Sequence, residues 1–395
     1  MSITLEGLTE EQREVISLVR QFTDEQIIPV ASDLERDDVF PDQIVAGLRE
    51  LGLFGFTIPE QYGGLGLDLT TYALSVIELS RGWMSVSGII NTHFIVADMI
   101  MRDGTEEQKQ RFLPQMATGE VRCAFSMTEP EAGSDVQAIR TRAVRDGDDY
   151  VVNGQKMWVT NGLRSGLVAL LVKTDPDAKP AHRGMSCLLV EKQPGAAQDG
   201  GLTIPPQLGK LGYKGVETTE LVFQDHRVPA ANLLGDGEGH GFQQMMSGIE
   251  VGRVNVAARG VGVAQRAFEL AIRYAQEREA FGKPIAKHQG IQFKLAEMAT
   301  KIEAARLLML SAARKKDAGE RSDVEAGMAK LYASEICHEV VEDSFRIHGG
   351  YGYSKEYEIE RLMREAPFLL IGEGTSEIQK TIISRGLLRE YKSRG

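Results

Sequence analysis

The spacing of apolar residues divides this chain into three successive parts. Up to about residue 120, apolar residues recur three and four positions apart, which is typical of helices that bury one face. Between about 121 and 230 they alternate with polar residues, as in strands, and from 241 onward the helical spacing returns. We therefore predict an α+β multidomain protein with an N-terminal helical domain (1–120), a middle β domain of barrel-like or sandwich form (121–230) and a C-terminal antiparallel four-helix bundle (231–395).

Capping residues mark where several helices of the first part begin. Thr9 is followed three residues later by Gln12, which is a capping-box pattern, and Thr105 caps another apolar run. A further helix is expected to open at Pro41 and to end at Gly52. Two more runs are apolar enough to be buried helices, at 71–79 and 89–101.

The middle part combines short apolar runs with turn residues. The runs 150–152 and 156–159 flank Asn153-Gly154, a dipeptide that favours the positive φ angles of a hairpin turn, so we predict a β-hairpin there. Further strands are expected at 167–172, 186–190 and 219–223, with a polar loop at 175–184. Long helices are expected in the last part at 257–276, 293–313 and 326–341.

Charge and composition narrow the range of partners. Of 395 residues, 45 are Lys or Arg and 56 are Asp or Glu, which gives a net charge of −11. An acidic surface repels phosphate backbones, so nucleic-acid binding is disfavoured. The N-terminus does not resemble a secretory signal, and no run of 18 apolar residues is free of charge. We therefore expect a cytoplasmic protein without a membrane span.

The three cysteines are too few and too widely spaced for a disulfide framework or a metal-ligand cluster. Cys123, Cys187 and Cys337 are expected to be reduced thiols packed as small hydrophobic groups. No metal site is predicted. The chain also lacks a Walker loop and a Gly-x-Gly-x-x-Gly turn, so a nucleotide cofactor would be held in another way.

Two strings in the middle part could contact a ligand. Residues 127–135 combine small residues, a proline and hydroxyls after an apolar run, which suits a loop whose N–H groups face a polar ligand. Trp158 and Thr160 lie two apart on an expected strand, so both would face one side, where a flat aromatic ligand could bind. An ordinary loop and a core tryptophan are the alternatives, and for each string alone they are favoured.

A third string, 371–377, carries a candidate base. Glu373 follows an apolar run and lies between two glycines, which let backbone approach a ligand closely. Apolar neighbours raise the pKa of a carboxylate, as a general base near neutral pH requires. A compatible alternative is a helix start, with Thr375 or Ser376 as the N-cap and Glu377 in the first turn.

Five strings in register resemble the acyl-CoA dehydrogenase family in order and spacing, from about residue 8 to 390. Each string is weak alone, but the set is specific, and the family's fold agrees with the α, β, α order. The strings are Met127-Thr128-Glu129-Pro130 with Gly133-Ser134-Asp135, then Trp158-Val159-Thr160-Asn161, Arg278 with Phe281-Gly282-Lys283, His348-Gly349-Gly350-Tyr351-Gly352, and Glu373-Gly374-Thr375.

The resemblance implies FAD as the cofactor. The loop with Met127, Thr128 and Ser134 would hold the flavin ring and the pyrophosphate, and Trp158 and Thr160 would flank the ring, with the Thr160 hydroxyl near N5. A second group matches residues that reach the FAD of a neighbouring subunit: Arg278, Phe281, Gln289, Arg346 and Gly350.

Two cofactor positions depart from the family. Arg346 stands where many members have Gln, and an arginine could pair with a phosphate directly. Thr375 and Glu377 are implied to lie near the same cofactor, but many members have Gln at the position of Glu377.

On the substrate side, the resemblance implies that Ser134, Phe242, Glu250, Arg253 and Gly374 contact the acyl-CoA. Glu250 and Arg253 are three apart on an expected helix and so share a face. Without the resemblance, an intrahelical ion pair between them would be the favoured interpretation.

The implied reaction is α,β-dehydrogenation of an acyl-CoA to a trans-2-enoyl-CoA, as in fatty acid β-oxidation. Glu373 would remove the α-proton, its N–H and a flavin ribityl hydroxyl would stabilise the enolate-like oxygen, and electrons would pass to an electron-transfer flavoprotein. A homotetramer, built as a dimer of dimers, is implied as well. Alternatives with the same fold are a flavin oxidase or monooxygenase, an enoyl-CoA reductase and an inactive homologue; the base argues against a monooxygenase.

The sequence also bears on which residue is the base and on the size and charge of the acyl group. Family members without a base at the position of Glu373 carry it just before the arginine of the CoA side, where this chain has Gly252. Val86 cannot pair with a substrate carboxylate, and Asn91 near the pocket floor would discourage a long apolar tail. Gly372 replaces a tyrosine of many straight-chain enzymes and leaves room unless neighbours refill it. We therefore expect a short or medium monocarboxylic acyl group, with branching near the thioester as an option.

Overall fold

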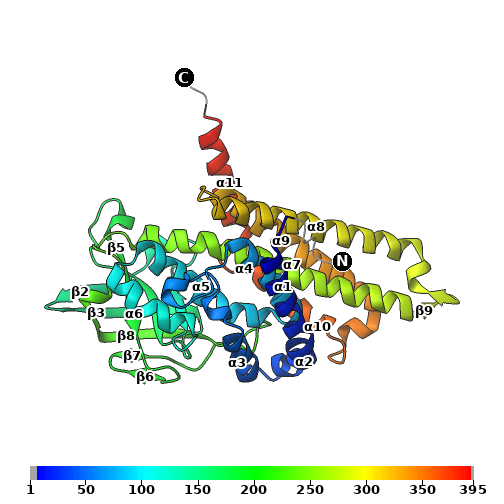
Figure 1. Cartoon of the computed structure of the whole chain (residues 1–395), viewed down its shortest axis with the longest axis horizontal. Coiled ribbons are helices and arrows are strands. Elements are labelled where there is room, and N and C mark those ends of the chain that lie inside the picture. Colours follow the sequence, from blue (N-terminus) through cyan, green and yellow to red (C-terminus); the bar gives the residue numbers. More distant parts are fainter. Residues whose placement is uncertain (1–6, 393–395) are drawn as a thin grey trace.

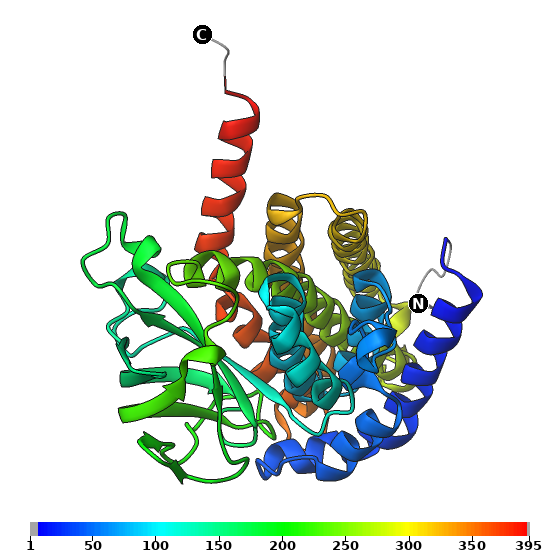
Figure 2. The ribbon, with the colours of Figure 1, turned by 60° about the vertical axis from the view of Figure 1, so that its left-hand side comes forward.

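The computed structural model describes residues 7–392 and has the predicted α, β, α order (Figure 1). The two helical parts pack on each other, and the sheet lies at one end of the elongated body (Figures 1 and 2). The N-terminal helices are α1 (Glu10–Phe22), α2 (Ile28–Arg36), α3 (Asp42–Glu50), α4 (Leu69–Gly82), α5 (Met84–Asp103) and α6 (Glu106–Ala117).

Local capping explains why several of these helices begin where they do. Thr9 and Thr105 each form a capping box, with Gln12 and Gln108 respectively, so two backbone N–H groups are satisfied at each helix start. Pro41 precedes α3, and Gly52 follows it with a φ of 70°, a conformation that glycine adopts without strain. The predicted helix starts are confirmed.

α5 is an apolar helix in the middle of the core. It is long and apolar enough to cross a membrane by length and composition alone, but 83% of its most apolar window is buried within the protein. Its neighbours are α4, α6, α7 and strand β1, which together cover it on several sides. This burial brings residues of α5 to the inside of the molecule, where the candidate base also lies.

The middle part is an eight-stranded sheet with the order β1-β4-β2-β3-β8-β7-β6, and β5 pairs with β4. β4 is buried on both faces: Leu167, Ala169 and Leu171 join the helical core, whereas Val168 and Leu170 join a second core inside the curled sheet. The strands are β1 (Cys123–Ser126), β2 (Arg142–Asp146), β3 (Asp149–Thr160), β4 (Leu167–Lys173), β5 (Met185–Glu191), β6 (Gln198–Asp199), β7 (Leu202–Thr203) and β8 (Thr218–Pro229).

The predicted hairpin at Asn153-Gly154 is wrong. β3 runs without a break through both residues, and the turn between β2 and β3 lies at Gly147, which has a φ of 61°. Gly154 instead sits at a bulge opposite β8, where a Cβ would come within 2.6 Å of the Cα of Thr141. The glycine is needed for close packing of the backbone and not for a turn.

The C-terminal helices are longer than the sequence predicted. α7 is a single helix of 37 residues, and it packs against α4, α5, α8, α9 and α10. The last helix, α11, projects away from the body in both views (Figures 1 and 2). The elements are α7 (Gly241–Glu277), β9 (Glu279–Ala280), β10 (Lys283–Pro284), α8 (Gln289–Asp317), α9 (Asp323–His348), α10 (Ile359–Ile371) and α11 (Ser376–Glu390). Cys123, Cys187 and Cys337 are free and buried, as expected.

Candidate active site

An aromatic side chain stands free at a bulge in β3. The register between β3 and β8 shifts between Lys156 and Val159, and within this bulge Trp158 has a φ of 62° and is 56% exposed. Val159 is buried, and Thr160, the next residue of the paired strand, is half-buried. Trp158 is therefore not a core tryptophan. Its indole is available to a flat ligand.

The loop 127–135 is fixed to this bulge by a buried ion pair. The Lys156 ammonium donates to the Met127 carbonyl and to Glu129 Oε1, at 2.9 Å each, and the Met157 N–H donates to the Thr128 carbonyl. Burial lowers the pKa of Lys156 to about 8, while Glu129 favours its charged form. The sequence analysis assigned no role to this pair, although Glu129 lies in the string 127–135 and Lys156 is two residues before Trp158.

The surface of this loop is open. Ser134 is exposed, and a Cβ built on Gly133 would meet nothing nearer than the Thr128 methyl at 3.9 Å. Backbone N–H groups beside a glycine can approach a phosphate closely. The loop and the exposed indole therefore form a surface that fits an aromatic ring joined to a phosphate, as in FAD.

Glu373 lies in the short connection between α10 and α11. Its φ of 54° and that of Gly374, 91°, bend the chain sharply. Lys330 donates to the Gly374 carbonyl at 2.7 Å, and Gln379 donates to the carbonyls of both residues. The Thr375 side chain accepts from the N–H of Ile378, so the helix-start interpretation of this string is confirmed for Thr375.

The Glu373 carboxylate is held inside the protein between α5 and α7. The Asn91 amide donates to Oε1, and Oε2 is buried without a hydrogen-bond partner among residues 7–392. A Cβ on Gly252 would lie 2.1 Å from Oε2, so only glycine fits opposite the carboxylate. Asn91 does lie at the site. Its amide nitrogen donates to the candidate base, whereas its Oδ1 is buried without a hydrogen-bond partner among residues 7–392.

The electrostatic surroundings of Glu373 act in two directions. Burial raises the pKa of the Glu373 carboxyl, because the charged form loses hydration. Arg259, the Asn91 amide and Lys330 favour the charged form and limit this rise. A carboxyl with a raised pKa and an unpaired oxygen is suited to accept a proton from a bound molecule.

The space beside Gly372 is filled. A Cβ on Gly372 would lie 2.7 Å from the Phe368 ring, and that ring stacks on Tyr213 with centroids 4.3 Å apart. The Tyr213 hydroxyl in turn lies against Gly88, where a Cβ would be 1.9 Å away. The extra room expected beside Gly372 is therefore occupied by Phe368 and Tyr213.

The residues expected on the CoA side do not form the alternative ion pair. Glu250 Oε1 accepts from the N–H and hydroxyl of Ser322 and lies 3.6 Å from the Lys316 ammonium. Arg253 is 8% exposed, and its Nε has no hydrogen-bond partner within the described chain. Phe242 lies at the start of α7, beside His182. Arg253 is therefore a buried cation that an anionic ligand group could satisfy.

The second group of expected cofactor residues lies elsewhere. β9 and the start of α8 are at the opposite end of the body from β2 and β3 (Figure 1). One chain thus does not bring Arg278, Phe281 or Gln289 to Trp158. Phe281 is 94% exposed, and Arg346 is paired only with Glu342 among residues 7–392. Glu377 is exposed in the first turn of α11.

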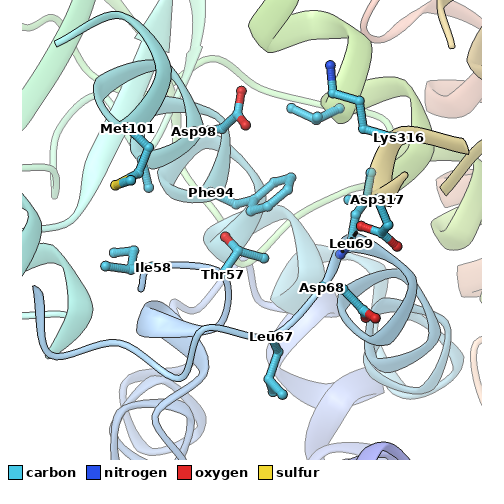
Figure 3. A pocket seen from close by; sticks show the side chains of 12 residues that line it. Thr57, Ile58, Leu67, Asp68, Leu69, Phe94, Asp98, Met101, Lys316 and Asp317 are labelled. Atoms are coloured by element: carbon cyan, nitrogen blue, oxygen red, sulfur yellow. Dashed lines mark hydrogen bonds between the residues drawn. The ribbon is translucent and has the colours of Figure 1, made fainter. Parts of the chain in front are cut away.

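A pocket of about 250 Å³ lies near the C-terminal end of α5 (Figure 3). Asp98 and Lys316 project at its rim, and the Phe94 ring lies inside it. Phe94 also stacks on Tyr72 with centroids 4.0 Å apart, and Tyr72 accepts a hydrogen bond from Asn255 on α7. Neither Tyr72 nor Glu373 lines this pocket.

The chain belongs to the acyl-CoA dehydrogenase family. Models of the family's N-terminal, middle and C-terminal domains match residues 9–120, 124–226 and 239–388, respectively. The fold and the oxidoreductase class predicted from the sequence are confirmed by these matches.

Individual relatives differ in the acyl group that they are named for. The chain is 42% identical to an acyl-CoA dehydrogenase of Bacillus subtilis over 96% of this chain and 99% of that protein. It is 42% identical to (2S)-methylsuccinyl-CoA dehydrogenase of Cereibacter sphaeroides, over 97% of this chain and 70% of that protein. It is 41% identical to acryloyl-CoA reductase (NADH) of Anaerotignum propionicum, over 97% of this chain and 96% of that protein.

Solved structures agree with this assignment. Butyryl-CoA dehydrogenase from Megasphaera elsdenii superposes with a TM-score of 0.92 at 36% identity, over 98% of this chain and all of that one. A glutaryl-CoA dehydrogenase from Mycobacterium smegmatis in complex with FADH2 superposes with a TM-score of 0.88 at 30% identity, over 96% of this chain and 95% of that one. Members of this family are FAD-dependent.

Proposed function

We propose that this protein is an FAD-dependent acyl-CoA dehydrogenase in which Glu373 removes the α-proton of the substrate. The observation that supports this most is the Glu373 carboxylate, which is held by Asn91 opposite Gly252 with Oε2 buried and unpaired. Gly252 occupies the alternative position of the base and has no side chain to act. Glu373 is therefore the one base that we assign.

FAD fits the surface around Trp158. Met127, Thr128, Ser134, Trp158 and Thr160 would hold the flavin and its pyrophosphate, because they line one open, glycine-containing surface with a free indole. When bound, FAD supplies the acceptor for the β-hydride. Thr375 and Glu377, at the start of α11, remain candidates for a further cofactor contact.

The chain's own groups would bind and orient the acyl-CoA. Arg253 and Phe242, with Glu250, would meet the CoA part, and Ser134 and Gly374 would lie beside it. The N–H of Glu373 donates to no acceptor within residues 7–392, so it is free to stabilise the developing charge on the thioester oxygen. Proton abstraction then needs only a short movement of the buried carboxylate.

We also propose that the cofactor site is completed by a second subunit. Phe281 projects almost fully into solvent with a φ of 54°, which is costly for a side chain that serves only its own chain. With Arg278, Gln289, Arg346 and Gly350 it would reach the FAD of a neighbour, within a dimer of dimers. The projecting α11 offers a further surface for such an assembly.

A short or medium acyl group, straight or branched, is the substrate that we propose. The stacked rings of Tyr72 and Phe94 close the inner end of the site, and Phe368 with Tyr213 fills the space beside Gly372. Electrons would pass to an electron-transfer flavoprotein. The free, buried thiols are consistent with our expectation of a cytoplasmic enzyme.

Reduction of an enoyl-CoA is a second candidate. The likeness to acryloyl-CoA reductase (NADH) favours it, because the same base and cofactor can serve the reverse reaction. NADH-dependent loss of enoyl-CoA, compared with acyl-CoA-dependent reduction of the flavin, would identify the direction.

The proposed function is tested with the Glu373→Gln holoenzyme. The amide keeps the shape of the side chain but cannot accept the proton, so we expect FAD and acyl-CoA to bind while turnover falls by roughly 10²–10⁴-fold. Anaerobic bleaching of the flavin by butyryl-CoA measures this in both proteins. Bleaching at the wild-type rate in the variant would refute Glu373 as the base, and no bleaching of the wild type by any acyl-CoA would refute the proposed function.

A further inference from the structure

Arg259 is a buried cation that forms no ion pair within residues 7–392, although its charge acts on the nearby Glu373 carboxylate. It lies on α7 and is 2% exposed. Within residues 7–392 its hydrogen bonds go to neutral groups, from Nε to Asn255 Oδ1 at 2.7 Å and from Nη1 to the Tyr213 hydroxyl at 3.4 Å. A guanidinium does not lose its proton in a protein, so this charge cannot be removed by titration.

The other arginines buried to this degree are paired. Arg306 forms an ion pair with Glu303, and Arg361 forms ion pairs with Glu358 and Glu365. Such pairing offsets the several kcal/mol that burial of a single charge costs. Arg259 departs from this pattern, and its departure occurs next to the candidate base.

Arg259 lies on the face of α7 that borders the Glu373 carboxylate. It follows Gly252 by seven residues, which is two helical turns and about 10 Å along the axis. The bond to Asn255, four residues earlier, shows that the side chain points back toward Gly252. The Arg259 guanidinium therefore lies between its own turn of α7 and the Glu373 carboxylate, which is opposite Gly252.

Two hydroxyls accompany the guanidinium. The Tyr213 hydroxyl accepts from Arg259, and the Tyr72 hydroxyl accepts from the Asn255 amide, so the proton of each hydroxyl can be donated elsewhere. Burial raises the pKa of both tyrosines, which keeps them protonated. A guanidinium with two hydroxyl donors is a set that suits a carboxylate.

We propose that Arg259, with the hydroxyls of Tyr213 and Tyr72, binds a carboxylate at the far end of the acyl group. The substrate class is then a short dicarboxylic acyl-CoA, with the second carboxylate attached to the β-carbon or one methylene beyond it. The inference rests on the proposed function and leaves the proton and hydride transfer unchanged. It replaces our expectation of a monocarboxylic acyl group, which considered Val86 alone.

A competing role for Arg259 is to serve as the counter-charge of Glu373. In that role the guanidinium would stabilise the ionised base for every substrate alike. In the proposed role, loss of the guanidinium lowers kcat/KM more for a dicarboxylic substrate than for a neutral one of the same shape, because its effect on Glu373 is common to both. The two roles therefore differ in how the effect depends on the ligand.

Matched ligand pairs test this. Succinyl-CoA is compared with 4-methylpentanoyl-CoA, and glutaryl-CoA with 5-methylhexanoyl-CoA, because an isopropyl group replaces the carboxylate at similar shape. We expect wild-type kcat/KM to favour the carboxylate by at least about tenfold in one pair. Arg259→Gln should lower the ratio of carboxylate to isopropyl kcat/KM in that pair by roughly 100-fold. Arg306→Gln, the matched control at an equally buried arginine, should leave the ratio within each pair unchanged.

Binding is measured separately from turnover. Titration of the Glu373→Gln holoenzyme with each ligand, followed by flavin absorbance, should give a lower Kd for the dicarboxylic acyl-CoA than for its isopropyl counterpart in the favoured pair. In the double variant Glu373→Gln/Arg259→Gln this difference in Kd should disappear. Equal wild-type kcat/KM within both pairs would overturn the inference, as would an equal loss for both members in Arg259→Gln. Because the isopropyl ligands report the dehydrogenase reaction alone, their oxidation without a carboxylate preference would leave the proposed function standing.

Discussion

Replacement of Asn91 by leucine should shift the pH dependence of the reaction upward. The Asn91 amide donates to Glu373 Oε1 from α5, and this hydrogen bond favours the ionised carboxylate. Leucine has nearly the same size and offers no donor. The variant therefore keeps the packing of the site while the ionised base loses the hydrogen bond that α5 provides.

The size of the shift follows from the strength of the lost bond. A hydrogen bond to a charged group contributes about 1.5–3 kcal/mol, and one pKa unit corresponds to about 1.36 kcal/mol. The pKa of Glu373, already raised by burial, should therefore rise further when this bond is lost. A general base must be deprotonated in the free enzyme, so kcat/KM rises with pH through this pKa, and the acidic limb of the profile moves to higher pH.

The assay is kcat/KM for one acyl-CoA, measured from acid to neutral pH in wild type and variant. Asn232→Leu is the control, because Asn232 is an equally buried amide that donates to Leu189 and Glu191 in the sheet, away from Glu373. It should lower stability and leave the limb in place. A lower rate of Asn91→Leu with an unmoved acidic limb would refute the view that Asn91 acts through the ionisation of Glu373.

Two further predictions concern assembly and chain length. Phe281→Ala removes a side chain that is 94% exposed, so monomer stability should be unchanged while bound FAD and oligomer mass both fall. Gel filtration with light scattering measures the oligomer mass, and the flavin-to-protein ratio measures bound FAD. Val144→Ala, at an exposed position of the sheet, is the control. Wild-type FAD content in Phe281→Ala would contradict the proposed role. Phe94→Ala removes the ring that stacks on Tyr72 and should move the kcat/KM maximum toward longer acyl chains, whereas Met101→Ala, in the same pocket, should not; an unchanged chain-length profile would show that the stack does not close the site.

Helix starts were predictable because their causes are local. Thr9 and Thr105 satisfy backbone groups within one turn, so four residues of sequence contain the whole interaction. Gly154 shows the opposite case. Its sequence neighbours favour a turn, but the requirement for glycine comes from Thr141 on the adjoining chain segment, which spacing within one strand does not reveal.

The candidate site was predictable where a string carries both the chemistry and its backbone. Glu373 between two glycines is such a case. Its partner Asn91 is 282 positions away, and sequence reasoning gave only that this amide needs partners near the pocket floor. The Lys156–Glu129 pair was detectable in principle, because Glu129 lies in one string expected to meet the ligand and Lys156 lies two residues before the other. Arg259 lies outside every string.

Arg259 and Arg253 are two buried cations on α7 that could anchor the two ends of a substrate. Gly252, Arg253 and Arg259 follow one another on a single helix, so the positions of the gap opposite the base, the CoA-side cation and the inner cation along the axis are set by helix geometry. Gly252 leaves the gap that the Glu373 carboxylate fills, and any side chain there would displace that carboxylate. A molecule anchored by an anion at Arg253 and by a second anion at Arg259 would therefore have both ends fixed relative to the base. A neutral acyl group would have only the first anchor, and its α-carbon would be positioned less tightly against Glu373.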